Sequence, residues 1–490
     1  MELERFRDFD CYEVIPASER GDAVYLGARW EKSWKWNEAT NEYDCRARYV
    51  GQEFKWLEWR DDLFAPAAGH DLSRLVDFMV MKRGLTGFTC DASNAYFHAP
   101  EDENVVVKPP KEFVEQERAA GRRVDILWRM KKILPGRRKG SKSWMEFLAK
   151  TLVECGLEQC PAAPQFYKGV RDGRRSIVLE AHMDDMHGGG VDCELEPFFA
   201  QLESMIMLKI EMHYASGAVY DHLKRHRRRT PEGTYISPNA RYVQGVAQAL
   251  GLDGCKSVAT PSVIGRQAEE NDAEKLEGSD VKLFRSSVGS LAYAAIDRED
   301  VQLEINRLAK QMSSPTVGGM VTLRRVVRYM VGTADFEVKM PIPTDKSQKR
   351  AHLKVFCDSD WAGQPGRNSQ TSVHVEIDGC PMHGYSKRQE AIALSSAEAE
   401  YYALTSGLSL GLYVKIVLEF MDFAVVATIA SDSSAARGIA RREGVGRVKH
   451  LSTRCLWAQQ VFKRKLFNLA VVLGTENQQT WAPRRWQDPS

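Results

Sequence analysis

Residues Ser176–Val191 read SIVLEAHMDDMHGGGV and predict a β-hairpin with two adjacent carboxylates at its tip. Apolar residues lead into the pair at the density of a strand, and three consecutive glycines follow it, so we expect the turn between Met183 and Met186. Asp184 and Asp185 would then lie side by side, which is costly unless cations bind there. An Asp-Asp pair in a turn is more often a solvated loop, and only other segments of the chain separate the two interpretations.

The chain of 490 residues is too long for one ordinary hydrophobic core, and its length favours about three domains. With 43% apolar and 27% charged residues it reads as a soluble globular protein, and no apolar run reaches transmembrane length. The N-terminal MELERFRDFD lacks the apolar region of a signal peptide. Ten scattered cysteines without metal-binding spacing indicate reduced thiols in the cytosol or nucleus.

Basic residues gather in local clusters, although the net charge of the chain is only +2. The clusters lie at Lys131–Lys132, Arg137–Lys139 and Lys224–Arg229. Such a cluster can bind nucleic-acid phosphates, but it is more often the solvated face of an ordinary fold. The charge pattern therefore permits nucleic-acid binding without requiring it.

Short β-prone runs, VYLGARW and CRARYVGQEF, occupy the chain from Ala23 to Trp56, whereas the residues before them show no clear element. Arg46 and Arg48 alternate with apolar neighbours, so they would share one face of a strand. A two-stranded flap with such a basic face can grip phosphates. It can equally be a solvated sheet face, and the residues alone leave both interpretations open.

The segment GFTCDASNAYFHAP, residues 87–100, predicts a short strand and then a helix. Asp91 follows the strand GFTC, and Ser93 would cap the helix. Asp91 can be a plain turn residue, but a carboxylate at the end of a strand is also a rigid mount for a metal ion. Further along, Pro135–Gly136 breaks a helical pattern, and amphipathic helices are expected over about 143–155 and 193–207.

Five motifs in one order resemble a known family: FAPAAG (Phe64–Gly69), CDASNAYFHAP, KPPKEF, RMKKILPGRRKGSKSW and HMDD. They are similar to FAPV, LDVKNAFLHG, QPPGF, RLKKALYGLKQAPRAW and YVDD, which occur at comparable spacing in the reverse transcriptases of copia-type LTR retrotransposons. Five motifs in a fixed order are far more specific than any one of them. The resemblance implies an RNA-directed DNA polymerase, a nucleotidyltransferase with palm, fingers and thumb.

The resemblance also implies residue roles. By motif position, Asp91, Asp184 and Asp185 would form one catalytic metal-binding triad, and Tyr96 would stand where reverse transcriptases block a ribose 2′-OH. Strand extension is an in-line attack of a 3′-hydroxyl on an α-phosphate, so two Mg²⁺ ions per active site are expected, with Mn²⁺ as a substitute. The deoxynucleoside triphosphate would be neutralised by basic residues of the fingers, namely Arg46, Arg48 and Lys139.

The chain departs from the family pattern at three places near these motifs. His182 replaces the usual Tyr before the paired aspartates, Pro135–Gly136 replaces the Tyr-Gly of the LYGLKQ loop, and Ser93 replaces a Lys. None of these changes removes a carboxylate, but all would weaken substrate positioning.

Residues 208–345 continue the resemblance, and TYISPNARYVQGVAQALG, ATPS, LFRSSVGSLAYAAIDREDVQLEINRLAKQMSSP and LRRVVRYMVGT match the thumb and connecting region. Their pattern is mostly helical. Leu303, Ile305, Leu308 and Met312 recur near helical spacing, as core residues do. The acidic stretch from 269 to 280 is expected to be a loop or linker.

From Leu353 the pattern fits a ribonuclease H fold, with the order strand, strand, strand, helix, strand, helix. LKVFCDSDWAG, SVHVEIDG and MHGYSKRQEAIAL would be strands, and the long helix SSAEAEYYALTSGLSLGLYVKIVLEF opens with a capping box from Ser395 to Glu398. AVVATIASDSSAARGIAR supplies the last strand and helix, with Asp432 between them. The family motifs SDADWAG, SKKQ, ALSSTEAEYMA and CDN resemble these segments closely.

By motif position, the metal ligands of this second domain would be Asp358, Glu400 and Asp432. Glu398 faces another side of the helix, and the AEY segment matches the AEL of ribonucleases H, so Glu400 is favoured. The family's fourth carboxylate is replaced by Thr480 in TENQQTWAPRRW, which would weaken the second metal site.

The implied fold class is α+β and α/β in several domains, a right-hand polymerase followed by a ribonuclease H-like mixed sheet. The expected domains are an N-terminal extension (1–22), fingers and palm (23–215), thumb and connection (216–345) and the ribonuclease H-like domain (346–490). Implied partners are an RNA template, a DNA primer, RNA–DNA hybrid, deoxynucleoside triphosphates and other Pol and Gag products, but no membrane. The implied location is a cytoplasmic virus-like particle or the nucleus.

Two other functions remain open. A degenerate, catalytically impaired remnant that folds and at most binds nucleic acid is favoured by His182, Pro135 and Thr480, and opposed by the retained carboxylates. An unrelated metal-dependent phosphatase or nuclease would share the carboxylates but not the order of the motifs.

Overall fold

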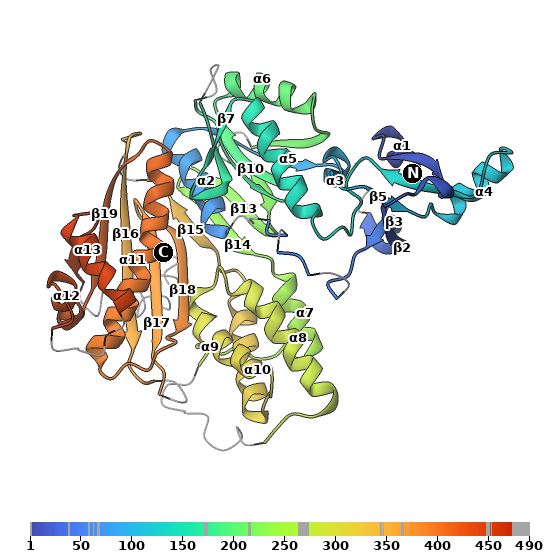
Figure 1. Cartoon of the computed structure of the whole chain (residues 1–490). Coiled ribbons are helices and arrows are strands. Elements are labelled where there is room, and N and C mark those ends of the chain that lie inside the picture. Colours follow the sequence, from blue (N-terminus) through green and yellow to red (C-terminus); the bar gives the residue numbers. More distant parts are fainter. Residues whose placement is uncertain are drawn as a thin grey trace. The chain divides into compact units, whose positions relative to one another are not determined.

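The computed structural model describes residues 2–37, 40–56, 59–61, 63–65, 69–170, 175–213, 217–262, 274–343, 345, 347–363, 367–446, 451 and 453–472. The chain forms two compact units, which are described separately (Figure 1). Unit 1 comprises Met1–Gly69 and Gly87–Met212, and unit 2 comprises His70–Thr86 and His213–Ser490.

The first sheet of unit 1 includes the N-terminus. Its strands follow the order β1-β6-β5-β2-β3 and span Tyr12–Pro16, Ile126–Met130, Val105–Val107, Val24–Asn37 and Glu42–Gln52. Helix α4 and the 3-10 turn η1 span Lys111–Ala119 and Ala17–Glu19. Phe6 of α1 (Glu2–Asp8) packs with these strands around the fully buried Trp128. Residues 1–22, where the sequence showed no clear element, therefore contribute a helix and a strand to this core.

The second sheet of unit 1 carries the predicted hairpin near its centre. Its strands follow the order β11-β4-β10-β9-β8-β7 and span Leu208–His213, Thr86–Ala92, Asp185–Gly190, Val178–His182, Ala163–Gly169 and Leu157–Cys160. Helices α5 (Gly140–Glu154) and α6 (Asp192–Glu203) lie over this sheet (Figure 1) and share its core. Both helices overlap their predicted ranges, so the sequence located them correctly.

The hairpin is formed by β9 and β10, and it confirms the turn expected between Met183 and Met186. Asp185 pairs with His182 in the antiparallel register, which leaves a two-residue turn. The glycines after the aspartates lie in the middle of the sheet. A Cβ added to Gly188 would lie 2.3 Å from Phe88 Cζ, so a larger residue would displace β10 from β4.

The helix expected after Asp91 is present and is four residues long. It is α3, Ala95–His98, and its N-cap is Asn94 in a left-handed conformation with φ of 56° and no side-chain cap hydrogen bond. The predicted cap, Ser93, is therefore wrong. The backbone N–H of Ser93 instead donates to the carbonyl oxygen of Met207 at 2.9 Å, just before β11 begins.

Unit 2 contains a four-stranded sheet, β12-β13-β14-β15, with strands Val219–His222, Arg225–Thr230, Gly233–Pro238 and Val338–Pro341. Its helices α2, α7, α8, α9 and α10 span His70–Arg83, Arg241–Ala249, Gly278–Ala294, Glu299–Lys310 and Val317–Gly332. Helices α7–α10 share one apolar core. Residues 208–345 were expected to be mostly helical, and the strands β11–β15 correct that expectation.

The sequence did not predict β13 as a strand because its inward-facing residues are charged. Arg225 and Arg227 are buried, whereas His226 between them is exposed. Arg225 pairs with Asp297 at 2.6 Å, and Arg227 pairs with Asp77 at 3.0 Å. Because arginines take the inward positions, the strand shows no apolar alternation, and its sequence looked like a basic patch. Buried charges of this kind persist only when they are paired.

The second sheet of unit 2 follows the order β18-β17-β16-β19-β20, with strands Cys380–Arg388, Gln370–Ile377, Arg350–Asp360, Ala424–Ser431 and Asn468–Val471. Helices α11, α12 and α13 and the 3-10 turn η2 span Ser396–Phe420, Ser434–Arg441, Trp457–Lys463 and Thr453–Leu456. β16 runs antiparallel to β17 and parallel to β19. These elements follow the order of strands and helices that the sequence predicted from Leu353 onward.

Helix α11 crosses the face of this sheet (Figure 1) and packs there through glycines. A Cβ at Gly407 would lie 3.2 Å from Ile429 Cδ1, and one at Gly411 would lie 2.9 Å from Val355 Cγ2. In the described part of the chain, α11 is also the one helix long and apolar enough to span a membrane, which the sequence analysis did not recognise. Its burial against β16, β17 and β19 explains that composition as core packing.

Candidate metal-binding carboxylate sites

Asp91, Asp184 and Asp185 lie together at one end of the second sheet of unit 1. β4 and β10 are neighbours in this sheet, and Asp91 stands next to the last residue of β4. The backbone N–H of Ala92 donates to the carbonyl oxygen of Asp184 at 2.8 Å. This hydrogen bond joins the end of β4 directly to the tip of the hairpin.

The charges of these aspartates affect one another. Burial raises the pKa of Asp91, and the charge of Asp184 raises it further, whereas cations that include Arg46 lower it. Burial likewise raises the pKa of Asp185, the charges of Asp184 and Asp91 add to the rise, and His182 opposes it. Such mutual repulsion is relieved when a cation binds, so the donor set fits a divalent metal ion.

The three aspartates are nevertheless not gathered as tightly as the ligands of a formed metal site. Among the residues that the structure describes, they are absent from the groups whose ligand atoms all lie within 4.8 Å of one another. Mg²⁺ binds oxygen at about 2.0–2.1 Å and usually keeps several waters or substrate phosphates. Side-chain rotation, or bridging by a substrate, would therefore be needed before one ion contacts all three.

The turn is supported by Trp144 of α5, which the sequence analysis did not single out. Its side chain is fully buried, and Nε1 donates to the carbonyl oxygen of Met183 at 2.9 Å. Met183 has a φ of 59°, a left-handed conformation that is uncommon for a residue other than glycine. The tryptophan at the end of the GSKSW motif was visible in the sequence, but its backbone partner was not.

Tyr96 is half-buried on α3, a few residues beyond Asp91. Its hydroxyl lies 3.2 Å from Ser141 Oγ, and its ring packs against the start of α5, where a Cβ on Gly140 would lie 3.3 Å from Cε1. The absence of a side chain at Gly140 thus makes room for the ring.

Arg46 and Arg48 are exposed on β3 and share one face of the β2–β3 hairpin, as predicted from their alternation. They pair with Ser33 and Glu31 across the hairpin. Arg46 is close enough to Asp91 for each charge to shift the pKa of the other group. This basic face is therefore near the end of β4 within unit 1.

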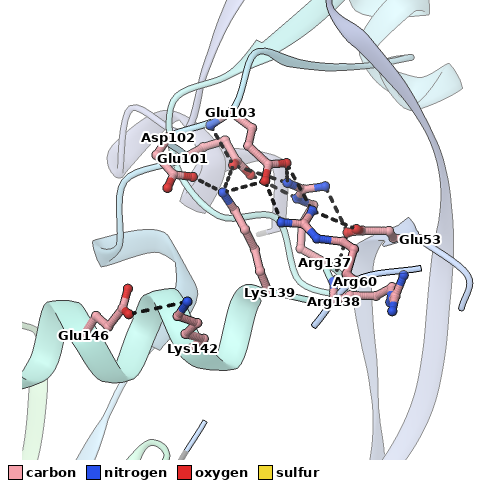
Figure 2. Close-up of polar contacts among 10 residues, drawn as sticks. All are labelled: Glu53, Arg60, Glu101, Asp102, Glu103, Arg137, Arg138, Lys139, Lys142 and Glu146. Atoms are coloured by element: carbon pink, nitrogen blue, oxygen red, sulfur yellow. Dashed lines mark hydrogen bonds and ion pairs between the residues drawn. The ribbon is translucent and has the colours of Figure 1, made fainter. Parts of the chain in front are cut away.

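Lys139 differs from these arginines because it is buried in a cluster of carboxylates (Figure 2). Its Nζ lies 3.2 Å from an oxygen of Glu101 and 3.2 Å from an oxygen of Glu103, and it also pairs with Asp102. Arg137 enters the same cluster through Glu101, at 3.1 Å. A lysine held by three carboxylates is not placed to neutralise a triphosphate, so this geometry does not support that predicted role.

The same cluster fixes the Pro135–Gly136 turn. Arg137 reaches Glu53 just after β3 at 2.9 Å, and the N–H of Gly51 donates to the carbonyl oxygen of Pro135 at 2.7 Å (Figure 2 shows the ion pairs). Gly136 has a φ of 93°, and a Cβ there would lie 2.2 Å from the carbonyl oxygen of Gly51. The departure from the Tyr-Gly pattern thus retains the glycine that this close approach requires.

Asp358, Glu400 and Asp432 form a second, tighter group in unit 2. Each offers one carboxylate oxygen, and these atoms all lie within 4.8 Å of one another. Asp358 is near the end of β16, Asp432 follows β19, and Glu400 is in the second turn of α11. Because β16 and β19 are parallel, their carboxyl ends meet at one edge of the sheet.

The electrostatics of this second group are strongly unfavourable without a cation. Burial, followed by the charge of Asp358, raises the pKa of Glu400 to about 8. Burial, followed by the charge of Asp432, raises the pKa of Asp358 to about 6. The Oε2 atom of Glu400 is buried without a hydrogen-bond partner in the described structure. An all-oxygen set with an unsatisfied acceptor fits Mg²⁺ or Mn²⁺.

The neighbouring Glu398 has a separate role. Its N–H donates to Ser395 Oγ at 3.2 Å, and its Oε2 accepts from the N–H of Leu394 at 2.8 Å. These contacts form the N-terminal cap of α11, so Glu398 is used by the helix while Glu400 faces the other carboxylates. Thr480, the predicted replacement for a fourth carboxylate, lies outside the described residues.

Sequence comparisons assign the chain to a family. The family model for reverse transcriptase (RNA-dependent DNA polymerase) matches residues 10–264. The retrovirus-related Pol polyprotein from transposon RE2 of Arabidopsis thaliana is 26% identical over 81% of this chain and 26% of its own length. The one from transposon TNT 1-94 of Nicotiana tabacum is 23% identical over 97% of this chain and 35% of its own length. The chain thus spans about a quarter to a third of these curated relatives.

Solved structures resemble the chain only weakly. The alignment with the prototype foamy virus protease-reverse transcriptase CSH mutant covers 96% of this chain and 52% of the viral chain, at 11% identity and a TM-score of 0.27. The alignment with an N-terminal RNase H domain from Mycobacterium tuberculosis, fused to maltose binding protein, covers 27% of this chain and 89% of the matched chain, at 19% identity and a TM-score of 0.21. Similarities this low support no conclusion about function.

The match to the reverse transcriptase model extends over more than half of the chain and contains Asp91, Asp184 and Asp185. The Pol polyproteins also align beyond it, over most of the chain. The chain therefore belongs to the reverse transcriptase (RNA-dependent DNA polymerase) family, in the form carried by the Pol polyproteins of copia-type retrotransposons.

Proposed function

We propose that the chain is an RNA-directed DNA polymerase with a C-terminal ribonuclease H, and that both act by two-metal phosphoryl transfer. The observation that carries the proposal is the meeting of Asp91 with Asp184 and Asp185, joined through the Ala92–Asp184 backbone hydrogen bond. In this proposal the sheet that holds them is the palm, the β2–β3 hairpin belongs to the fingers, and α7–α10 form the thumb and connection.

At the polymerase site the three aspartates would hold two Mg²⁺ ions, or Mn²⁺ in their place. Bound metals would activate the primer 3′-hydroxyl and stabilise charge on the α-phosphate and its leaving group. The residues of the chain orient the reactants around that centre. Arg46 and Arg48 would neutralise the triphosphate, and the ring of Tyr96 would exclude a nucleotide that carries a 2′-hydroxyl.

At the nuclease site Asp358, Glu400 and Asp432 would hold metals that activate water for attack on RNA. Thr480 adds no negative charge, so we expect the second metal to bind weakly and cleavage to be low at ordinary Mg²⁺. A titration of hybrid cleavage with Mg²⁺ and Mn²⁺ tests this, with Thr480→Asp alongside. Full activity at low Mg²⁺ that Thr480→Asp does not improve would show that Thr480 is not at the fourth ligand position.

Primer extension on an RNA template tests the polymerase proposal directly. The full chain should extend a DNA primer with deoxynucleoside triphosphates and Mg²⁺. Asp91→Asn should lower the rate by about a thousandfold or more, because an amide cannot supply the charge that the metals require. Asp125→Asn, a change of the same chemistry at an exposed loop residue, should leave the rate unchanged.

The second candidate is a degenerate remnant that folds and binds nucleic acid without turnover. It is favoured by the loose spacing of the three aspartates and by His182 beside them. Under this alternative the wild-type chain extends no primer with either Mg²⁺ or Mn²⁺, yet binds a primer–template. That pair of results would replace the polymerase proposal.

The partners and location follow from the same proposal. An RNA template, a DNA primer, their hybrid and deoxynucleoside triphosphates are its substrates, and other Pol and Gag products of the element would accompany it. Reverse transcription would take place in a cytoplasmic virus-like particle or in the nucleus.

A further inference from the structure

A buried glutamine of unit 2 contacts the helical turn that carries Glu400. Gln389 is the first residue after β18, and it is 7% exposed. Its Nε2 donates to the carbonyl oxygen of Ala399 at 2.8 Å and to Thr371 Oγ1 at 3.0 Å. The Ala399 carbonyl belongs to the peptide unit that joins Ala399 to Glu400. The amide therefore holds the backbone directly before a proposed metal ligand.

The orientation of this amide is fixed by its partners. A carbonyl oxygen only accepts hydrogen bonds, so the atom that faces Ala399 must be the nitrogen of the amide and not its oxygen. The backbone N–H of Gln389 donates to the carbonyl oxygen of Ser369 at 2.8 Å, which anchors the residue beside the start of β17. The side chain thus extends from a strand end to the helix, with its nitrogen toward the helix.

The same amide connects the strand of Asp358 with the helix of Glu400. Thr371 of β17 pairs with Ser359 of β16 in the antiparallel register, and Ser359 directly follows Asp358. The apolar contacts of α11 resist its separation from the sheet but have no preferred direction, whereas a hydrogen bond also limits sliding and rotation of the helix. The contact therefore restricts how one carboxylate can move relative to the other.

The unbalanced contacts of this amide indicate that stability alone does not explain its presence. The Oε1 atom of Gln389 is buried and has no hydrogen-bond partner among the residues that the structure describes. A buried acceptor without a partner is destabilising, and an apolar side chain of similar size would avoid that cost. A glutamine at this place is therefore better suited to fixing a position than to adding stability.

We propose that Gln389 is a positioning residue for the carboxylate group of unit 2, and that its amide sets how far Glu400 reaches toward Asp358 and Asp432. This inference rests on the proposed ribonuclease H function, in which these carboxylates hold metal ions. Gln389 is not a ligand in this proposal, and it acts through the peptide unit before Glu400. Without its two hydrogen bonds the first turns of α11 can shift against β17, and the carboxylates lose the spacing that a metal ion requires.

Binding of Mn²⁺ tests this role without requiring cleavage. Every protein is the full chain with Asp184→Asn/Asp185→Asn, which suppresses binding in unit 1, and free Mn²⁺ is measured by electron paramagnetic resonance. Gln389→Met keeps the length of the side chain and removes both donated hydrogen bonds. It should bind Mn²⁺ about tenfold to a hundredfold more weakly, the usual loss when a residue that orients a metal ligand is removed. Asp358→Asn should abolish the same binding event and so locate it.

Gln459→Met is the matched control. Gln459 is also a buried glutamine of unit 2, and its Nε2 donates to the carbonyl oxygens of Ile439 and Gly444, each at 3.0 Å. The control loses two hydrogen bonds of the same kind, but these join α13 to the C-terminal end of α12 rather than to α11. Its Mn²⁺ affinity should therefore equal that of the wild type. If Gln389→Met keeps the affinity of this control, the inference is overturned.

Thr371→Val separates the two hydrogen bonds of the amide. It removes the Oγ1 acceptor and keeps the size of the side chain, so Mn²⁺ binding should weaken several-fold, less than in Gln389→Met. In the Gln389→Met background the same change should have no further effect, because the amide that it contacts is already absent. Losses that simply add in the double variant would contradict a connection through Thr371.

Hybrid cleavage distinguishes this inference from the proposed nuclease function. At a Mn²⁺ concentration near the wild-type Kd, and without the substitutions in unit 1, Gln389→Met should lower kcat about tenfold or more and leave KM for the hybrid within about twofold. A rise in KM with an unchanged kcat would refute the positioning role. If Mn²⁺ affinity falls as expected but the wild type cleaves no hybrid, the positioning role stands and the proposed nuclease function fails.

Discussion

The two carboxylate groups of this chain differ in how closely their oxygen atoms are gathered in the absence of a metal ion. In unit 2, Asp358, Glu400 and Asp432 lie within 4.8 Å of one another, and burial and repulsion raise the pKa of Glu400 to about 8. In unit 1, Asp91 and Asp185 also have raised pKa values, but the three aspartates do not form so tight a group in the described structure.

The difference follows from the elements that hold the side chains. The carboxylates of unit 2 are on two parallel strands and on a core helix packed against them, so their positions are fixed by a continuous core. Two of the aspartates of unit 1 instead belong to a hairpin tip, held by the Ala92 backbone hydrogen bond and by Trp144. If metal ions and substrate draw the ligands together when they bind, the looser arrangement of unit 1 is sufficient. In unit 2 the fold already holds the carboxylates close together, so their negative charges repel one another until a cation binds.

The largest expected effect comes from neutralising one carboxylate at each site, because each change should abolish only one of the two activities. Asp185→Asn should reduce primer extension by about a thousandfold or more and leave hybrid cleavage unchanged, because the lost charge belongs to one metal site. Asp358→Asn should do the reverse. Rates of both reactions on one preparation of each variant check this. A loss of both activities in either variant, with an unchanged melting temperature, would show that the two groups do not act separately.

A second prediction concerns the ring of Tyr96 and its proposed role in the choice of nucleotide. Tyr96→Ala should raise the ratio of ribonucleotide to deoxyribonucleotide incorporation by about tenfold to a hundredfold, because a steric barrier to a hydroxyl is removed. Tyr96→Phe keeps the ring and loses only the contact with Ser141, so its ratio should match wild type. Competitive incorporation at one template position measures it. An unchanged ratio in Tyr96→Ala would remove the steric role.

A smaller effect is expected at the support of the hairpin tip. Trp144→Phe removes the hydrogen bond to the Met183 carbonyl, and a buried acceptor left unpaired costs about 1–3 kcal/mol. If that cost falls on the turn, kcat for primer extension should drop about tenfold with little change in KM, and hybrid cleavage should stay constant. Circular dichroism would identify a general loss of folding. Equal losses of both activities in a folded variant would contradict a local role.

The smallest effect concerns stability and pH. The folded pKa of Glu400, about 8, exceeds its ordinary value of 4.5, so the folded state retains a proton that the unfolded state releases. Stability from this group is therefore present below about pH 4.5 and is lost as the pH rises toward about 8. In EDTA, Glu400→Gln should melt a few degrees above wild type near pH 8 and equal to it near pH 4.

Added Mg²⁺ should likewise raise the melting temperature of the wild type near pH 8, and it should affect Glu400→Gln less. Asp185→Asn, at the looser site, should show a smaller pH-dependent gain than Glu400→Gln. A larger gain in Asp185→Asn would reverse the comparison between the two sites.

Secondary-structure elements were predicted best where the spacing of apolar residues agreed with the turn and capping residues at their ends. The hairpin over 176–191, the helices α5 and α6 and the N-cap at Ser395 were all located from local signals, although the Glu398 side chain accepts from Leu394 rather than from Ser395. The choice of Glu400 over Glu398 needed a family motif as well as helical geometry, and the structure assigns Glu398 to the cap.

The features that could not be predicted from the sequence are buried basic side chains whose acidic partners are distant along the chain. Arg225 and Arg227 looked like a basic surface because Asp297 and Asp77, which neutralise them, are far away in sequence. Lys139 looked available to a triphosphate for the same reason, since its carboxylates follow α3. A charged side chain gives no local sign of whether water or an opposite charge surrounds it.

The glycines of α11 affect how this chain would lose function through accumulated substitutions. Gly407 and Gly411 allow α11, the helix that also carries Glu400, to lie against Val355 and Ile429. A larger residue at either glycine would push α11 away from the sheet and shift Glu400 with it, although none of the three carboxylates had changed. If Asp358, Glu400 and Asp432 act as proposed, a substitution beneath α11 would abolish that function while all three carboxylates remain in the sequence.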